Sequence, residues 1–261
     1  ERGKVMIDIH THILPGLDDG SDSMEKSLEM AEIAVRSGIQ LAAATPHCNI
    51  RGYFENYEDS GVCRDVFQQF RSMLREERIP LKIVRGMEIY GVGDLRPLIG
   101  ERRLISLNHT GNYLIEFPFD MHPDEMGDGL HMVLESGGVP VMAHPERYYC
   151  VQDTPDLVYR WMQEGILTQV NAGSFLGGFG RREERTAVAL LEHGLITCLA
   201  SDCHGIRRRS PDMREAESYI RSRQSPDAAG QLFYENPHAI LTGENVRRGE
   251  MWGFGERRSF F

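Results

Sequence analysis

The sequence has no long hydrophobic run, no cysteine pair of the CxxC type and no excess of basic residues. No stretch approaches the ~20 apolar residues of a membrane span, and the N-terminus shows no secretory signal pattern. The five cysteines are odd in number, which favours reduced thiols over a disulfide framework. The net charge of −10 argues against general binding to nucleic acid or membrane surfaces. We therefore expect a cytoplasmic globular protein, with residues 1–5 as a short native extension or a remnant of cloning.

Short apolar runs alternate with amphipathic stretches along the whole chain. The runs are typical of strands covered on both faces, and they lie at 5–9, 39–44, 81–85, 113–117, 139–143, 168–171 and 197–200. The amphipathic stretches predict helices at 24–37, 57–77, 123–136, 155–164 and 181–193. Repeated strand-then-helix spacing indicates a parallel sheet, and seven strands with no break favour a barrel over an open sheet.

The first apolar run ends in His10-Thr11-His12. Side chains two positions apart on a strand point to the same face, so both imidazoles are expected at one spot. A lone pair of this kind has an ordinary explanation as surface histidines. In a parallel α/β barrel, however, functional residues gather at the carboxyl ends of the strands. We therefore compared the residues that follow each of the other runs.

Imidazole or carboxylate side chains follow six of the seven runs. Together they make nine potential metal ligands: His10, His12, Asp19, His47, Glu88, Glu116, His144, Asp202 and His204. Nine ligands exceed the need of one ion, and two or three ions that share carboxylates fit better. Mixed histidine and carboxylate ligation suits Mn, Fe or Zn better than Ca or Mg.

These residues stand in strings that resemble the polymerase-and-histidinol-phosphatase (PHP) superfamily. Within it, the sequence is most similar to the metal-dependent tyrosine-protein phosphatases of bacterial capsule and exopolysaccharide systems. The likeness runs from about residue 6 to about residue 248. It is carried by Ile7-Asp8-Ile9-His10-Thr11-His12, Ala44-Thr45-Pro46-His47, Ile115-Glu116-Phe117-Pro118-Phe119, Ala143-His144-Pro145-Glu146-Arg147 and Ala200-Ser201-Asp202-Cys203-His204.

The resemblance implies one PHP domain over residues 1–261, folded as a distorted (β/α)7 TIM-like barrel with three divalent ions. All nine candidate ligands match family ligand positions. Mn is the preferred metal, with Fe or Zn as alternatives. Arg147 and Arg209 match phosphate-binding positions, although Arg207 and Arg208 adjoin the second one. The catalytic set is thus Arg147, Arg209, Glu88 and Asp19, and the implied substrate is a phosphotyrosyl protein, the tail of a bacterial tyrosine kinase.

The expected chemistry is hydrolysis of a phosphate monoester without a covalent enzyme intermediate. A hydroxide that bridges metal ions would attack phosphorus in line. Arg147 and Arg209 would hold the non-bridging oxygens through charge-assisted hydrogen bonds. The sequence does not identify the acid that protonates the tyrosyl oxygen.

Three other interpretations are open at this point. Cys203 and Arg209-Ser210 fit the C-x5-R-S pattern of thiol-based tyrosine phosphatases, in which a thiolate attacks phosphorus. The same barrel could hydrolyse a small phosphate ester such as histidinol phosphate, or a nucleotide. It could also be a metal-bound regulatory module without catalytic activity.

Overall fold

The computed structural model describes residues 5–255. Nine strands lie within this range: β1 (Met6–Thr11), β2 (Ile39–Ala44), β3 (His47–Cys48), β4 (Lys82–Arg85), β5 (Glu88–Tyr90), β6 (Asn112–Glu116), β7 (Val139–Ala143), β8 (Leu167–Asn171) and β9 (Cys198–Ala200). The α-helices are α1 (Met24–Ser37), α2 (Val62–Glu76), α3 (Leu95–Gly100), α4 (Pro123–Glu135), α5 (Tyr149–Asp153), α6 (Asp156–Gln163), α7 (Arg181–Glu192), α8 (Arg214–Arg223), α9 (Pro226–Gly230) and α10 (Asn236–Thr242). Residues 1–4 of the expected extension lie outside the described range.

The apolar pattern predicts most of the strands correctly. Each of the seven runs overlaps a strand, and the runs at 39–44 and 139–143 coincide with β2 and β7. The pattern does not predict β3 and β5, because two or three residues are too few to show a periodicity. Pro46 separates β3 from β2, and Gly86 lies between β4 and β5. These two short strands carry His47 and Glu88, so the omission falls within the candidate site.

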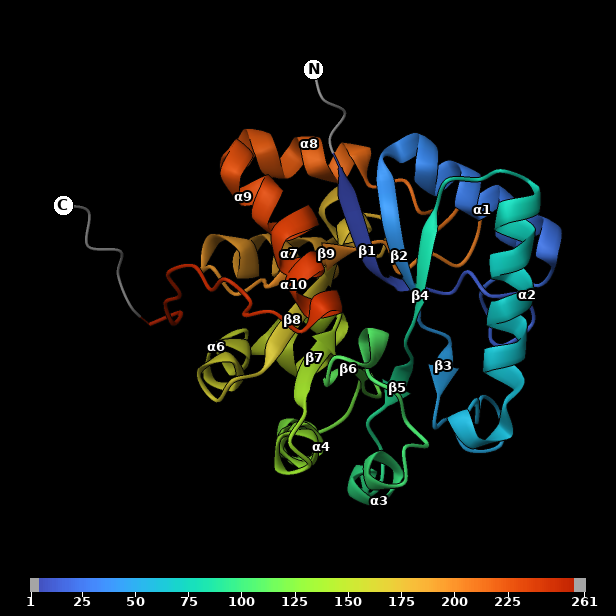
Figure 1. Cartoon of the computed structure of the whole chain (residues 1–261). Coiled ribbons are helices and arrows are strands. Elements are labelled where there is room, and N and C mark those ends of the chain that lie inside the picture. The colour runs from blue at the N-terminus through green and yellow to red at the C-terminus, as the bar shows by residue number, and fades with distance from the viewer. Residues whose placement is uncertain (1–4, 256–261) are drawn as a thin grey trace.

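All strand pairs are parallel, in a three-stranded sheet β1-β2-β4 and a six-stranded sheet β3-β5-β6-β7-β8-β9. A parallel bridge between Thr11 and Cys203 joins the end of β1 to the segment after β9. The backbone N–H of His12 donates to the Cys203 carbonyl at 3.0 Å, which reinforces this junction. Figure 1 shows the strands around a common axis with α1, α2, α4, α6 and α8 outside them and α10 in front of the strands, a TIM-like barrel.

The apolar core has two parts, one inside the strands and one between the strands and the outer helices. The inner part contains alternate residues of the strands, as expected when every second side chain points inward. The 3₁₀ turn η2 (Leu107–His109) adds Leu107 to it, and α10 adds Ile240 and Leu241. The barrel interior is therefore packed, and polar side chains are free to gather at its carboxyl end.

Two further expectations concern the whole chain. All five cysteines are free thiols, as their odd number and spacing indicate. No helix within residues 5–255 has the combination of length and apolarity that crossing a bilayer requires.

Candidate metal centre

Strand β1 delivers two imidazoles to the carboxyl end of the barrel. His10 and His12 are both buried, and their Nε2 atoms lie 3.1 Å apart, which confirms that they share one face. Gln169 Oε1 lies 2.7 Å from Nδ1 of His10, and Asp18 Oδ2 lies 2.7 Å from Nδ1 of His12. Because both partners are acceptors, each Nδ1 carries a proton, and each Nε2 is directed at the centre, in a position to bind a cation.

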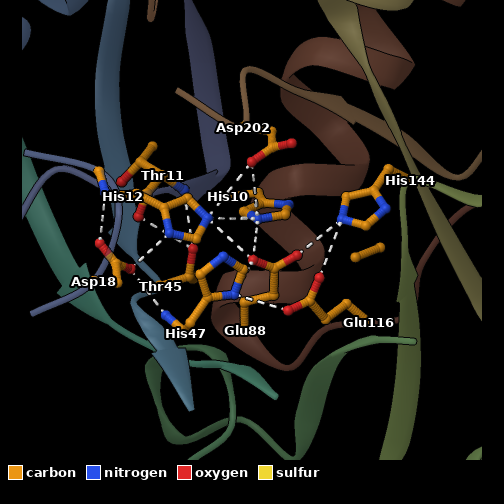
Figure 2. Close-up of polar contacts among 12 residues, drawn as sticks. His10, Thr11, His12, Asp18, Thr45, His47, Glu88, Glu116, His144 and Asp202 are labelled. Atoms are coloured by element: carbon orange, nitrogen blue, oxygen red, sulfur yellow. Dashed lines mark hydrogen bonds and ion pairs between the residues drawn. The ribbon is translucent and has the colours of Figure 1, made fainter. Parts of the chain in front are cut away.

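Glu88, the first residue of β5, lies at the middle of the cluster (Figure 2). Its Oε2 is 3.1 Å from Nε2 of His10, 3.0 Å from Nε2 of His12 and 3.0 Å from Nδ1 of His47. Its Oε1 is 2.9 Å from Nε2 of His144. One carboxylate thus contacts four imidazoles from three segments of the barrel. Such a group is well placed to bridge neighbouring cations.

Glu116, at the end of β6, widens the cluster on the side of His144. Its Oε1 lies 2.8 Å from Nδ1 of His47, and its Oε2 lies 3.9 Å from Nε2 of His144. The two imidazoles therefore approach different oxygens of one carboxylate. Glu116 is buried like Glu88, so the two acids form the floor of the site.

Asp19, Asp202 and His204 complete the set from the opposite side. Asp19 Oδ1 lies 3.4 Å from Nε2 of His47 and 3.2 Å from Nε2 of His204, and its side chain is about half exposed. Asp202 is buried, with Oδ1 3.4 Å from Nε2 of His10. The structure thus brings together all nine side chains that the sequence singles out.

The ligand atoms form three overlapping groups, in each of which they lie within 4.8 Å of one another: His12, Asp19, His47 and His204; His10, His12, Glu88 and Asp202; and His47, Glu88 and Glu116. Several buried nitrogen and oxygen atoms of the candidate ligands, among them Glu88 Oε2 and His204 Nε2, form no hydrogen bond of good geometry within the described chain. Buried polar atoms without hydrogen bonds are costly unless another partner, such as a cation, is bound. The residues present therefore fit divalent metal ions.

The charges of the cluster favour cations. Burial alone would raise the pKa of Glu88, but the imidazoles of His10 and His47 outweigh it and hold that pKa well below its usual range. Burial lowers the pKa of His144 to about 4, so this ring is neutral at physiological pH. At His10, His12 and His47 the neighbouring carboxylates outweigh burial and raise the pKa, which favours protonated rings while no cation is bound. Metals bind ionised carboxylates and neutral imidazoles, so cations bound here would replace those protons.

Three residues of the site have left-handed backbone conformations. The φ angles are 35° for His144 and 50° for both Asp202 and Arg209. A non-glycine residue in this region costs about 1–3 kcal/mol and persists only when the surroundings fix it. Strain of this kind concentrates at functional sites, and here it aims side chains at one centre.

Two guanidinium groups lie next to the cluster. Arg147 Nη1 is 3.5 Å from Asp202 Oδ2, and Arg209 Nη2 is 2.6 Å from Asp202 Oδ1. Both side chains line a pocket of about 610 Å³ that also contacts Asp19, Glu88, Glu116 and His144. Arg207 and Arg208 are exposed and do not line this pocket. Within this run of arginines, it is Arg209 that lines the pocket.

Cys203 cannot serve as the nucleophile of a thiol phosphatase. Its side chain is fully buried, and burial raises the pKa of its thiol. A nucleophilic cysteine needs the opposite, an accessible sulfur with a lowered pKa. The C-x5-R-S interpretation is therefore wrong.

Sequence reasoning missed the residues that orient the ligands. Asp18 accepts from His12 and from the backbone N–H of His47, at 2.7 and 2.9 Å. Gln169 Nε2 donates to Asn171 Oδ1 at 2.9 Å, and Asn171 Nδ2 donates to Asp202 Oδ2 at 2.8 Å. Buried polar residues within the apolar run at 168–171 were the available signal for this chain of hydrogen bonds.

Comparisons with known proteins agree with the geometry. The family model for capsular polysaccharide synthesis proteins, CpsB/CapC, matches residues 6–242. The chain is 35% identical over 257 residues to the tyrosine-protein phosphatase YwqE of Bacillus subtilis, which covers 95% of this chain and 100% of that protein. It is 32% identical over 249 residues to the tyrosine-protein phosphatase CpsB of Streptococcus agalactiae serotype V, covering 92% of this chain and 100% of CpsB.

Solved structures give the same result. A crystal structure from work on YwqE from Bacillus subtilis and CpsB from Streptococcus pneumoniae, described as unique metal-dependent tyrosine phosphatases, superposes with a TM-score of 0.89 at 35% identity. The match covers 97% of this chain and 100% of that one. The phosphotriesterase homology protein from Escherichia coli, at 11% identity and a TM-score of 0.60 over 92% of this chain and 100% of that one, shares the fold.

Proposed function

Because the chain belongs to the CpsB/CapC family of capsular polysaccharide synthesis proteins, we propose that it is a metal-dependent phosphatase that hydrolyses phosphotyrosine in proteins. The observation that carries this proposal is the convergence of nine imidazole and carboxylate side chains at the base of a pocket that two arginines also line. A site of this kind can bind several cations and an anionic ester together. The relatives named above, which are tyrosine-protein phosphatases, support the choice of substrate.

We propose that the three overlapping ligand groups bind three divalent ions, with Mn preferred over Fe or Zn. Glu88 would be shared between two of the groups, as would His12 and His47. Ions bound there would supply a hydroxide nucleophile near neutral pH and neutralise charge on the phosphoryl oxygens. Gln169 and Asp18 would keep the Nε2 atoms of His10 and His12 directed at these ions.

The arginines are proposed to bind the non-bridging oxygens of the phosphoryl group. Both contact Asp202, so their guanidinium groups have a fixed position before substrate arrives. Donors held in place in this way stabilise developing charge without reorganisation. Charge-assisted hydrogen bonds to phosphate are among the strongest that side chains form.

We also infer that the barrel has seven strands, two of which are interrupted. The pairing of β2 with β4 at Ala44–Arg85 and of β3 with β5 at His47–Glu88 keeps one register across the breaks. Counting β2 with β3, and β4 with β5, as two interrupted strands leaves seven. This count would place Glu88 and His47 on neighbouring strands of the barrel. The resemblance to the PHP family supports the count of seven.

The proposed partner is the phosphotyrosyl tail of a bacterial tyrosine kinase in the cytoplasm. The link to capsular polysaccharide synthesis in the family description supports a role in that system.

The test is a phosphatase assay with metal-stripped protein rebuilt with Mn, Fe, Zn or Mg. We expect no turnover of a phosphotyrosyl peptide after stripping, and the highest turnover after rebuilding with Mn. Activity that survives complete removal of metal would overturn the proposal.

The small-ester alternative is tested in the same experiment. A higher kcat/KM for histidinol phosphate than for the phosphotyrosyl peptide would keep the metal chemistry and replace the substrate.

A further inference from the structure

Aromatic side chains line the pocket together with the candidate ligands. The lining of this pocket of about 610 Å³ includes Phe54, Tyr90, Phe117, Phe119 and Tyr149. Phe119 and Tyr149 are partly exposed, at 37% and 52%. Neither metal binding nor the binding of a phosphoryl group by the arginines requires these rings.

Phe54 lies against His47 at one side of the pocket. The two rings are nearly parallel, at 11°, with centroids 5.8 Å apart. An antiparallel bridge between Ile50 and Phe54 closes a tight turn that presents the ring. Asn49 fixes the base of this turn by donating to the Tyr90 carbonyl at 2.8 Å. The position of Phe54 is thus built into the loop.

Phe119 lies over His144. The centroids of these rings are 6.2 Å apart, with an angle of 64° between the planes. The guanidinium carbon of Arg147 lies 4.5 Å from the centroid of the Phe119 ring. Phe119 therefore contacts a proposed phosphate-binding group and still has surface open to the pocket.

The two phenyl rings contact imidazoles that approach different oxygens of Glu116. His47, next to Phe54, approaches Oε1 of this carboxylate, whereas His144, next to Phe119, approaches Oε2. We call the part of the pocket that Phe54 and Phe119 line the aromatic slot. It adjoins His47 and His144 of the ligand cluster, so the group attached to a bound phosphoryl oxygen would lie near these rings.

We propose that the aromatic slot binds the ring of an aryl phosphate and thereby selects aryl over alkyl phosphate esters, an inference that rests on the proposed function. An aromatic ring placed there gains contact with two apolar π surfaces, and each aromatic pair contributes about 0.5–1.5 kcal/mol beyond the area buried. An alkyl chain fills the same volume without these contacts. Phe54 and Phe119 are then specificity-determining residues for phosphotyrosine over phosphoserine.

The experiment uses two phosphonates that cannot be hydrolysed, benzylphosphonate and methylphosphonate, titrated calorimetrically into the Mn-loaded protein. The ratio of their dissociation constants measures recognition of the ring independently of leaving-group chemistry. We expect Phe54→Leu and Phe119→Leu each to reduce the preference for benzylphosphonate about three- to tenfold. Phe54→Tyr, which retains a ring, should keep the preference. Tyr234→Leu, an exposed aromatic outside the pocket, is the matched control.

The ratio of dissociation constants also separates the contribution of the aromatic slot from that of Arg147. Phe119→Leu will loosen Arg147 and weaken both phosphonates by a common factor, which cancels in the ratio. An unchanged ratio of dissociation constants in both leucine variants, which means that both phosphonates are weakened equally, would overturn the proposal of an aromatic slot. If the wild-type protein still hydrolyses phosphotyrosyl peptide in that case, the proposed function stands. If the wild-type protein hydrolyses no phosphate ester, both proposals fall.

Discussion

Two regions of the pocket differ in chemistry: the floor, formed by Glu88 and the other candidate ligands, is polar, whereas the mouth, formed by Phe54 and Phe119, is aromatic. At the floor, Glu88 and the imidazoles around it are buried and held by hydrogen bonds at strand ends. At the mouth, Phe54 and Phe119 are partly exposed, come from loops and are held by ring contacts. The floor contacts what all phosphate monoesters share, whereas the mouth contacts what differs between them. Changes at the floor should therefore lower turnover of every ester, and changes at the mouth should alter preference.

The largest effect is expected at Glu88. Glu88→Gln keeps the shape of the side chain but removes the charge that two ligand groups share. We expect kcat to fall at least about a thousandfold, because bound metal contributes several kcal/mol of charge stabilisation. The fall should be equal for phosphotyrosyl peptide and for an alkyl phosphate, measured with protein saturated in Mn. A loss confined to the aryl substrate would break the distinction between floor and mouth.

Arg209 is the next test, because it contacts both the cluster and the pocket. Arg209→Ala should lower kcat/KM about 10²–10³-fold, as removal of one preorganised donor does in other hydrolytic sites. Arg208→Ala is the matched control, since this neighbour is exposed and lies outside the pocket lining. Its effect should stay within about twofold. A larger loss from Arg208→Ala than from Arg209→Ala would show that the arginine at the floor is misassigned.

Asp18 tests how far the floor depends on residues that touch no substrate. Asp18→Asn keeps the size of the side chain but weakens its hold on His12 and on the backbone of His47. We expect Mn affinity to fall about 10–100-fold, with kcat largely recovered at saturating Mn. Calorimetric titration of Mn into the stripped protein gives this number without an assay. An unchanged Mn affinity would contradict the positioning role of Asp18.

The floor could be predicted from the sequence because its chemistry follows strand ends. His10 and His12 share a face by spacing alone, Glu116 ends a strand, and His144 and Asp202 follow the ends of two others. Parallel strands present their carboxyl ends at one side of a barrel, so convergence follows from topology. What the pattern missed on the floor were groups inside strands, such as Gln169, and the short strands β3 and β5.

The mouth could not be predicted in this way. Phe54 belongs to a loop without periodicity, and the sequence does not distinguish a phenylalanine that packs in the core from one that contacts a substrate. Its proximity to His47 depends on the turn that Asn49 anchors, a tertiary contact with Tyr90. Phe119 lies beyond the end of β6, and its relation to Arg147 joins loops that follow different strands. Loop geometry therefore decides the mouth, where strand order decides the floor.

The smallest effect is expected at Cys203, which lies behind the floor. Its side chain is fully buried and does not line the pocket, so Cys203→Ala should change kcat by less than about twofold, whereas loss of a true cysteine nucleophile would abolish turnover. The smaller side chain leaves a small cavity that costs about 1 kcal/mol, which corresponds to a Tm lower by about 2–4 °C. Chelation should abolish activity in the variant as in the wild type. Loss of activity in a variant that retains its Mn affinity and its melting temperature would show that the thiol takes part in the reaction, and the floor would then no longer be purely a metal site.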